Sequence, residues 1–228
     1  SKELLKQRME AVKAVLSGKS LTIITGFDAF MDSLLPKEEI EKRRIYISGD
    51  TVLDMTETAV KLARIGYVRE VEVNAPGQFA VRGGILDIYP LTEELPIRIE
   101  LWGDEVDSIR TFDVETQRSI ENLEDILIYP ATEFPEEEEK RVSFLDYFPI
   151  EDTLLLLDEP IRLTEKGQAV EEEFMEAQKR RMEEGFAVSD VEAKLYATRE
   201  IQKRMNQYSS IGFMSLEMQC KGFDVRAT

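Results

Sequence analysis

The sequence predicts an α/β protein, α+β overall, in which one α/β lobe is interrupted by an inserted and mainly antiparallel β domain. Helical apolar stripes and short apolar strands alternate toward both ends of the chain. Between them, strand-like runs separated by turn residues follow one another without helices. We therefore expect residues 1–66 and 136–228 to form the two parts of the lobe, and residues 67–135 to form the inserted domain.

The first segment alternates helical and extended patterns. The expected elements, in order, are a helix at 2–17, a short buried strand at 21–25, a helix at 27–35, a strand at 44–48 and a helix at 55–65. Pro36 ends the second helix, because proline lacks the backbone N–H that a helix interior needs. Asp54 can cap the third helix, and Gly66 can end it.

The inserted segment contains the most informative strand, "PIRIELW". Successive side chains of a strand point to opposite faces, so Ile97, Ile99 and Leu101 are expected in the core. Arg98 and Trp102 then share the outer face. A tryptophan beside an arginine on an exposed face is typical of a protein-binding hot spot. The alternative is that the arginine is simply solvated and that the tryptophan is covered by a loop.

Turn residues divide the rest of the inserted segment. Gly83–Gly84 indicates a bulge or a sharp bend, which is the usual meaning of glycine within a strand pattern. The stretch "DVETQRS" at 113–119 predicts a hairpin connection. The acidic run at 135–141 is expected to be a solvated linker that closes the inserted domain.

The last segment returns to a mixed pattern. The expected elements are a short helix at 143–148 capped by Ser143, a buried strand at 153–160, helices at about 161–184 and 190–207, and a final strand within 210–218. The run "TLLLLDEP" is apolar without alternation, which indicates a parallel sheet covered on both faces. Gly185 is expected to end the first long helix, and Ser189 to start the second.

Composition excludes several classes of function. The net charge is −17, and residues 71–135 carry four basic and fourteen acidic residues. Such acidity disfavours binding to the phosphate backbone of DNA, which needs clustered lysine and arginine. No apolar run approaches the length of a membrane span, and the charged beginning of the chain predicts no signal peptide. Cys220 is the single cysteine and there is no histidine, so we expect no internal disulfide framework and no metal site. A single cysteine is compatible with a reducing cytosol.

Two motifs suggest nucleotide chemistry, but both are incomplete. "SGKS" at 17–20 lacks the earlier glycine of a phosphate loop, and it follows a helix where that loop would follow a strand. A helix-to-strand turn with Gly18 near the helix end is expected instead. "LLLLDEP" ends in Asp158 and Glu159, where a helicase-like ATPase would hold magnesium. Without a phosphate loop we expect no catalytic residues and no cofactor, and these two acidic residues become vestigial positions that cap the next helix.

Three stretches carry a resemblance: "VRGGILDIYP" at 81–90, "PIRIELWGDEVDSIRTFD" at 96–113 and "ETQRS" at 115–119. They resemble the second domain of the bacterial transcription-repair coupling factor family, Mfd. The resemblance runs for about forty residues and extends more weakly over most of the chain. The excision-repair protein UvrB has a related module without the double glycine and the "ETQRS" tail, so the coupling factors are the closer match. In that family the second domain interrupts a degenerate helicase-like lobe.

The resemblance implies a protein-interaction module for DNA repair. In both families this module docks onto UvrA through positions that correspond to Arg82, Arg98 and Trp102, and tryptophan here stands where phenylalanine is usual. The whole cytoplasmic protein would use ATP to remove stalled RNA polymerase. This chain would have no ATPase activity and would reach RNA polymerase and DNA only through other domains. The alternative is a fragment of a UvrB-type ATP-dependent helicase whose phosphate loop lies upstream of Ser1.

Overall fold

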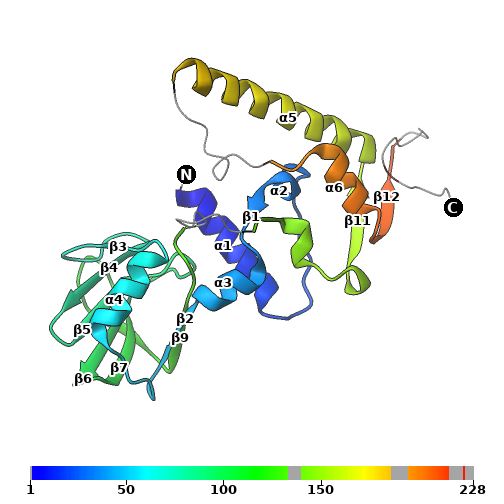
Figure 1. The fold of residues 1–228 in the computed structure, drawn as a ribbon. Coiled ribbons are helices and arrows are strands. Elements are labelled where there is room, and N and C mark those ends of the chain that lie inside the picture. The colour runs from blue at the N-terminus through cyan, green and yellow to red at the C-terminus, as the bar shows by residue number, and fades with distance from the viewer. Residues whose placement is uncertain (1, 133–139, 186–194, 216–222, 224–228) are drawn as a thin grey trace. The chain divides into compact units, whose positions relative to one another are not determined.

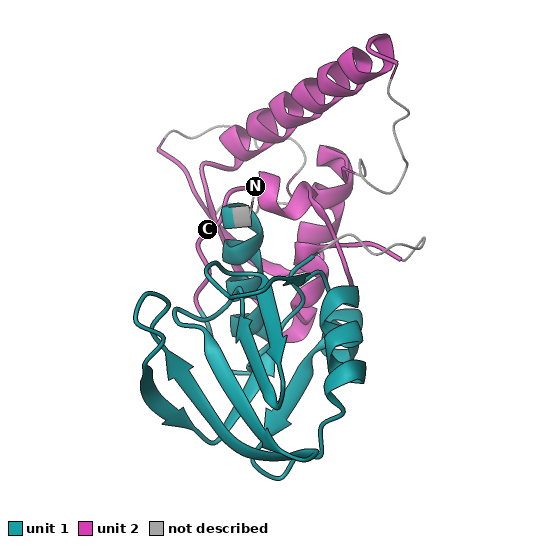
Figure 2. Ribbon diagram, turned by 90° about the vertical axis from the view of Figure 1, so that its left-hand side faces the viewer, with its two compact units in different colours: residues 1–21, 37–133 teal, residues 22–36, 134–228 magenta. Residues whose placement is uncertain are grey.

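Figure 1 shows a computed structural model of the chain. It describes residues 2–132, 140–185, 195–215 and 223. The chain divides into two compact units, which are coloured separately in Figure 2: unit 1 comprises residues 1–21 and 37–133, and unit 2 comprises residues 22–36 and 134–228. Both units mix helices with β-sheets, which confirms the expected α+β class.

Unit 1 is built around a six-stranded sheet. Its strands, in spatial order, are β3 (Val68–Arg69), β4 (Gln78–Arg82), β5 (Ile85–Tyr89), β6 (Ile97–Trp102), β7 (Glu105–Phe112) and β8 (Ser119–Leu123). β3 and β4 are parallel, and all the other neighbouring strands of this sheet are antiparallel. The predicted antiparallel sheet is confirmed, and so is the hairpin connection at "DVETQRS", which joins β7 to β8.

One face of this sheet forms the main apolar core. The other described elements of unit 1 are α1 (Lys2–Leu16), α3 (Lys37–Arg43), β2 (Ile45–Ser48), α4 (Met55–Arg64) and β9 (Asp125–Ile128), and β2 and β9 form an antiparallel pair. Residues of α4 and of the β2–β9 pair share the core with the sheet. In β6, Ile97 and Ile99 are 1% and 0% exposed and Leu101 packs against the same core. The alternation in the sequence therefore predicted the inner face correctly.

Helix α4 begins and ends where the sequence predicts. The Asp54 carboxylate accepts a 2.8 Å hydrogen bond from the backbone N–H of Glu57, which satisfies one of the free donors of the first helical turn. Gly66 follows the helix with φ of +96°. A β-carbon at this position would lie 2.7 Å from the Thr132 side chain. Glycine is therefore needed here for both its conformation and its small size.

Unit 2 contains several short elements and one long helix. They are α2 (Asp28–Met31), β1 (Ser33–Leu34), β10 (Val142–Ser143), the 3₁₀ helices η1 (Phe144–Tyr147) and η2 (Ile150–Asp152), β11 (Leu154–Asp158), α5 (Pro160–Glu183), α6 (Thr198–Met205) and β12 (Ser209–Phe213). β1 pairs with β10 in an antiparallel manner, whereas β11 and β12 are parallel. The strand predicted at 153–160 is therefore confirmed as β11, and its pairing is parallel as expected.

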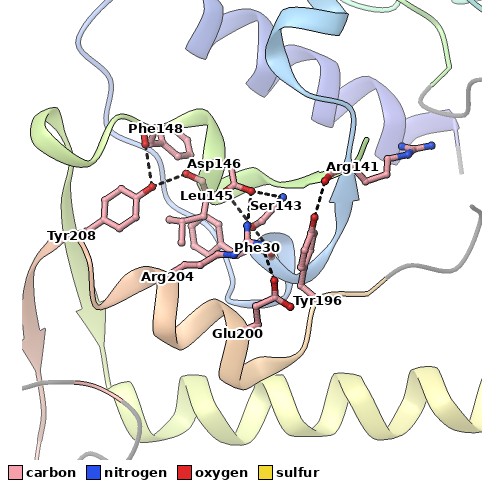
Figure 3. A network of polar contacts seen from close by, with 10 residues as sticks. All are labelled: Phe30, Arg141, Ser143, Leu145, Asp146, Phe148, Tyr196, Glu200, Arg204 and Tyr208. Carbon is pink, nitrogen blue, oxygen red and sulfur yellow. Dashed lines mark hydrogen bonds and ion pairs between the residues drawn. The ribbon is translucent and has the colours of Figure 1, made fainter. Parts of the chain in front are cut away.

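A polar network joins η1 to α6 within unit 2 (Figure 3). The Ser143 hydroxyl accepts a hydrogen bond from the N–H of Leu145, and the Asp146 carboxylate accepts one from the N–H of Ser143 at 2.8 Å. These two bonds form a capping box, so the helix predicted after Ser143 is confirmed in 3₁₀ form. Arg204 of α6 donates to the same Asp146 carboxylate at 2.5 Å, and the Tyr208 hydroxyl donates to the carbonyl of Leu145 at 2.9 Å. Unit 2 is therefore held together by side chains from distant parts of the chain.

The predicted buried strand at 21–25 is wrong. This stretch is not in a strand, and its apolar residues are exposed, with Ile24 at 96%. Isoleucine and threonine favour extended backbone, but a strand forms only when a neighbour supplies backbone hydrogen bonds. None of the described strands pairs with residues 21–25. The turn at Gly18, with φ of +68°, ends α1 as predicted, but it does not lead into a strand.

Three other elements differ from prediction in length or environment. The helix expected at 27–35 ends at Met31, because the following residues pair as β1. The helix expected at 190–207 is described from Thr198, and its predicted start at Ser189 lies outside the described residues, as do Cys220 and most of the acidic run. β11 is not covered on both faces, since Leu154 and Leu156 are 56% and 61% exposed while Leu157 is buried. A sheet of two strands packed on one side leaves its other side open.

The contacts place α3, β2 and α4 in the same unit as the six-stranded sheet. The three-part division at residues 66 and 135 stays a prediction.

Candidate protein-docking surface

The outer face of the six-stranded sheet carries the three residues singled out by the sequence. Arg98 and Trp102 occupy alternate positions of β6, with Glu100 between them on the same face. Arg82, the last residue of β4, pairs with Ile85 of β5, and Ile85 pairs with Glu100. Paired residues share a face, so the register places all three together on the side opposite the core. β5 lies between β4 and β6, so Arg82 is two strands away from Arg98 and Trp102.

The two arginines meet at a buried carboxylate, that of Asp87 on β5. Asp87 is 1% exposed and lies directly opposite Arg98 in the strand register. Arg98 donates from Nε to Oδ1 at 2.7 Å and from Nη2 to Oδ2 at 2.8 Å, while Arg82 donates from Nη2 to Oδ2 at 2.6 Å. The hydrogen bonds to Asp87 raise the pKa of the Arg98 guanidinium, so this group stays charged. Two cations and one anion therefore form a cluster on the outer face.

Arg98 is fixed by two further groups. Its Nη2 donates to the side-chain oxygen of Gln117 at 2.8 Å, and its guanidinium lies over the Phe112 ring, 4.4 Å from the ring centre. Gln117 has φ of +59°, a conformation that residues other than glycine rarely adopt. Only 14% of the Arg98 side chain is exposed, compared with 44% for Arg82. Arg82 is therefore the more accessible of the two cations.

Trp102 lies at the end of β6 and is 84% exposed. It pairs with Glu105 of β7, and Glu105 also forms an antiparallel bridge with Val52, which is 73% exposed. None of the hydrogen bonds or ring contacts described for this face involves Trp102. From the spacing of strands and residues, its Cα is about 12 Å from that of Arg82. Trp102 and Val52 therefore provide apolar surface beside the arginine cluster.

The charge balance of this face differs from that of the whole chain. Arg110 pairs with Glu100 across β6 and β7. Arg82, Arg98 and Arg110 are thus interspersed with the carboxylates of Asp87, Glu100 and Glu105, which leaves this face near neutral in a protein whose net charge is −17. Arg82 is the more exposed of the two arginines bound to Asp87, so it is accessible to a carboxylate on a partner.

Sequence reasoning missed Asp87, Gln117 and Val52. Asp87 could have been found, because it is a single charged residue between the apolar Leu86 and Ile88 in the strand "ILDIY". A charge in such a position is rarely buried without a partner. The sequence contains no comparable indication for the other two residues. Gln117 reaches Arg98 because of the conformation of the β7–β8 loop, and Val52 joins this face because it pairs with Glu105.

The vestigial nucleotide positions adopt a different arrangement from the predicted one. Asp158 ends β11 and is exposed, and Glu159 precedes α5 with φ of +47°. The sequence predicted that Glu159 caps α5, but its side chain makes no capping hydrogen bond to this helix. Its carboxylate instead accepts hydrogen bonds from the backbone N–H of Ser215, at 2.8 Å, and from the Ser215 hydroxyl. The cap is absent because this carboxylate lies toward the segment after β12.

The described residues contain no cluster of three or more acidic, histidine or cysteine side chains that could hold a metal ion. Among the described helices, none is both long and apolar enough to cross a membrane.

Comparisons with known proteins cover this part of the chain. Residues 45–134, which include β2 to β9 and the whole outer face, match the UvrB interaction domain. The chain is 32% identical over 249 aligned residues to a transcription-repair-coupling factor of Bacillus subtilis (strain 168), which covers 84% of this chain and 21% of the relative. It is 39% identical over 134 residues to that of Staphylococcus aureus (strain MRSA252), covering 59% of this chain and 11% of the relative. It is also 37% identical over 135 residues to UvrABC system protein B of Thermosipho africanus (strain TCF52B), covering 59% and 20%.

The chain thus spans about a fifth or less of the length of these relatives. The alignment with the Bacillus coupling factor extends over 84% of the chain, whereas that with UvrABC system protein B stops at 59%, which favours the coupling factors over the UvrB alternative. The resemblance read from the sequence is confirmed: the chain is similar to transcription-repair coupling factors over most of its length, and residues 45–134 match the UvrB interaction domain.

Proposed function

We propose that this chain is a protein-interaction module that recruits UvrA in transcription-coupled nucleotide excision repair. We assign the contact to the outer face of the sheet, with Arg82, Arg98 and Trp102 as its main residues. The observation that carries the assignment is the 84% exposure of Trp102 on the same face as a cationic cluster. Tryptophan and arginine are the residues most enriched at the centres of protein interfaces.

In this proposal the three residues contribute differently. Trp102, together with Val52, supplies apolar area that UvrA covers. Arg82, 44% exposed, pairs with a carboxylate on UvrA. Arg98 is held by Asp87 and Gln117, so its main contribution is to keep the cluster in place.

Binding measurements on the purified chain and UvrA of the same organism test this assignment. Trp102→Ala should weaken the affinity about thirtyfold, equivalent to about 2 kcal/mol, and should leave the melting temperature nearly unchanged. Tyr46→Ala is the matched control, because Tyr46 is an exposed aromatic residue on β2, on the core side of the sheet. Its affinity for UvrA should stay within about twofold of the unmodified chain. Unchanged affinity in both Trp102→Ala and Arg82→Ala would show that recruitment uses another surface.

We also propose that this chain has no ATPase activity of its own. The "SGKS" segment is a turn after α1, and the Glu159 carboxylate is engaged by Ser215. Calorimetric titration with Mg–ATP should show no binding in the micromolar range. Micromolar binding that disappears in Lys19→Ala would contradict the proposal.

The remaining functions belong to the longer parent protein in this proposal. We propose that the parent is a cytoplasmic ATP-dependent DNA translocase, and that RNA polymerase and DNA are contacted by its other domains. The lobe formed by the residues around the inserted domain would be a degenerate helicase-like lobe. Consistent with its net charge of −17, this chain should not shift duplex DNA in a gel near physiological salt. Submicromolar binding to DNA by this chain would contradict that division of roles.

A further inference from the structure

We infer that Asp87 is the positioning residue of the docking face, and that it acts on the partner through Arg82. The inference rests on the proposed function, since it assigns a role within the same surface. Asp87 is 1% exposed, so it cannot itself contact a partner protein. Its partner Ala80 in β4, which shares the outer face, is 1% exposed. A carboxylate withdrawn from water in this way needs cations or hydrogen bonds to compensate for the lost hydration.

The hydrogen bonds of Asp87 show what the carboxylate organises. Arg98 binds both carboxylate oxygens in a bidentate manner through Nε and Nη2, which fixes the relative orientation of the two side chains. Arg82 binds Oδ2, the oxygen that Arg98 Nη2 also uses. Two guanidinium groups are therefore held at one oxygen atom, although their charges repel each other. The carboxylate between them is what makes this proximity stable.

The two arginines differ in what they leave for a partner. Arg98 is 14% exposed, lies over Phe112 and also donates to Gln117, so most of its binding capacity is used within the chain. Arg82 is 44% exposed, and the structure shows its Nη2 on Asp87. A long side chain anchored at one donor loses less conformational freedom when its other donors bind. Asp87 thus preorganises Arg82 for a carboxylate on the partner, with Arg98 fixing Asp87 in turn.

A double-mutant cycle distinguishes positioning from general support of the fold. Asp87→Asn keeps the size of the side chain and removes its charge. If Asp87 acts through Arg82, this change should weaken UvrA binding about tenfold in the unmodified chain. In the Arg82→Ala background it should change the affinity by less than about twofold, because the group that Asp87 positions is already missing. The same loss in both backgrounds, or no loss in the unmodified chain, would overturn the inference.

A second measurement needs no partner. In the free chain, ¹⁵N relaxation of the Arg82 Nε–H group should report a restricted side chain, and Asp87→Asn should make it markedly more mobile on the ps–ns timescale. Equal mobility in the two proteins would overturn the inference. If Asp87→Asn does not unfold cooperatively, Asp87→Glu replaces it in both experiments. Glutamate keeps the charge, but its longer side chain moves the carboxylate away from its position beside Arg82. Weaker UvrA binding and a more mobile Arg82 are therefore expected for this variant as well.

The outcomes separate this inference from the proposed function. If Trp102→Ala and Arg82→Ala weaken UvrA binding and Asp87→Asn does not, the docking surface stands and the positioning role is wrong. If Trp102→Ala and Arg82→Ala leave binding unchanged, the docking proposal is wrong, and the role of Asp87 in UvrA binding is wrong with it. The relaxation experiment then still decides whether Asp87 anchors Arg82.

Discussion

The Tyr67 hydroxyl donates a 2.9 Å hydrogen bond to the backbone carbonyl of Tyr129, 62 residues further along the chain. Both residues are buried, and burial raises the pKa of Tyr67, which keeps its hydroxyl protonated as a donor. Tyr67 immediately precedes β3, and Tyr129 immediately follows β9. One buried hydrogen bond therefore links the place where the chain enters the sheet region to the place where it leaves.

Tyr67→Phe should lower the free energy of unfolding by about 1–2 kcal/mol, because it leaves the Tyr129 carbonyl buried without this donor. Tyr46→Phe is the control: its hydroxyl donates to Asp125 at 3.1 Å on an exposed surface, and its removal should cost no more than about 0.5 kcal/mol. Urea denaturation followed by circular dichroism measures both. Equal costs for the two changes would show that the Tyr67 bond contributes no more than an exposed one.

Gly66→Ala should destabilise the chain by about 2 kcal/mol or more. Gly66 has φ of +96°, and an added β-carbon would lie 2.7 Å from the side chain and 2.9 Å from the backbone nitrogen of Thr132. Gly49→Ala is the matched change, since nothing lies within 4 Å of the position of its β-carbon. That variant should melt within a few degrees of the unmodified chain. Comparable melting temperatures for the two variants would contradict the expectation.

Ile99→Ala should lower the free energy of unfolding by about 2–5 kcal/mol, since Ile99 is 0% exposed in the core of the sheet. Ile120, on the edge strand β8, is 56% exposed, and Ile120→Ala should cost less than about 1 kcal/mol. Chemical denaturation of the two variants gives the comparison. A small cost at Ile99 would mean that the core collapses readily around the missing atoms.

The Asp113 carboxyl should titrate below its ordinary range. Its Oδ1 accepts hydrogen bonds from the hydroxyl of Thr116 at 2.7 Å and from the backbone N–H of Thr116 at 2.8 Å, and both bonds lower the pKa of Asp113. Because the folded pKa lies below the unfolded one, the stabilisation is present above the unfolded value and is lost as the pH falls through the folded pKa. Carboxyl NMR titration should show the midpoint rising in Thr116→Val, while Thr116→Ser keeps the hydroxyl and should keep a low midpoint. A midpoint that is the same in Thr116→Val and in the unmodified chain would exclude the hydroxyl as a cause.

Local patterns were enough to predict one side of the site. The alternation in "PIRIELW" correctly placed Ile97 and Ile99 in the core and Arg98 and Trp102 on the opposite face. The period of a strand is a property of the backbone, so it can be read from a short stretch of sequence.

The partner of Arg98 could not be predicted in the same way. Asp87 meets Arg98 because of the register between β5 and β6, and that register depends on the loop between the two strands. The apolar stretch at 21–25 was mispredicted for a related reason. Its residues favour a strand, but pairing with another strand is a property of the whole fold.

Unit 2 is assembled from residues 22–36 and 134–228, which are synthesised at different times on the ribosome. The Phe30 carbonyl accepts a 2.5 Å hydrogen bond from the Ser143 hydroxyl, and the Met31 carbonyl accepts one from the N–H of Tyr196 at 2.8 Å. At about 5–20 residues per second, residues 22–36 emerge roughly 10–30 s before the last of these partners. All strands of the six-stranded sheet have been synthesised by residue 123. The strands of the six-stranded sheet can therefore pair co-translationally, whereas residues 22–36 gain their partners in unit 2 only after much more of the chain has been synthesised.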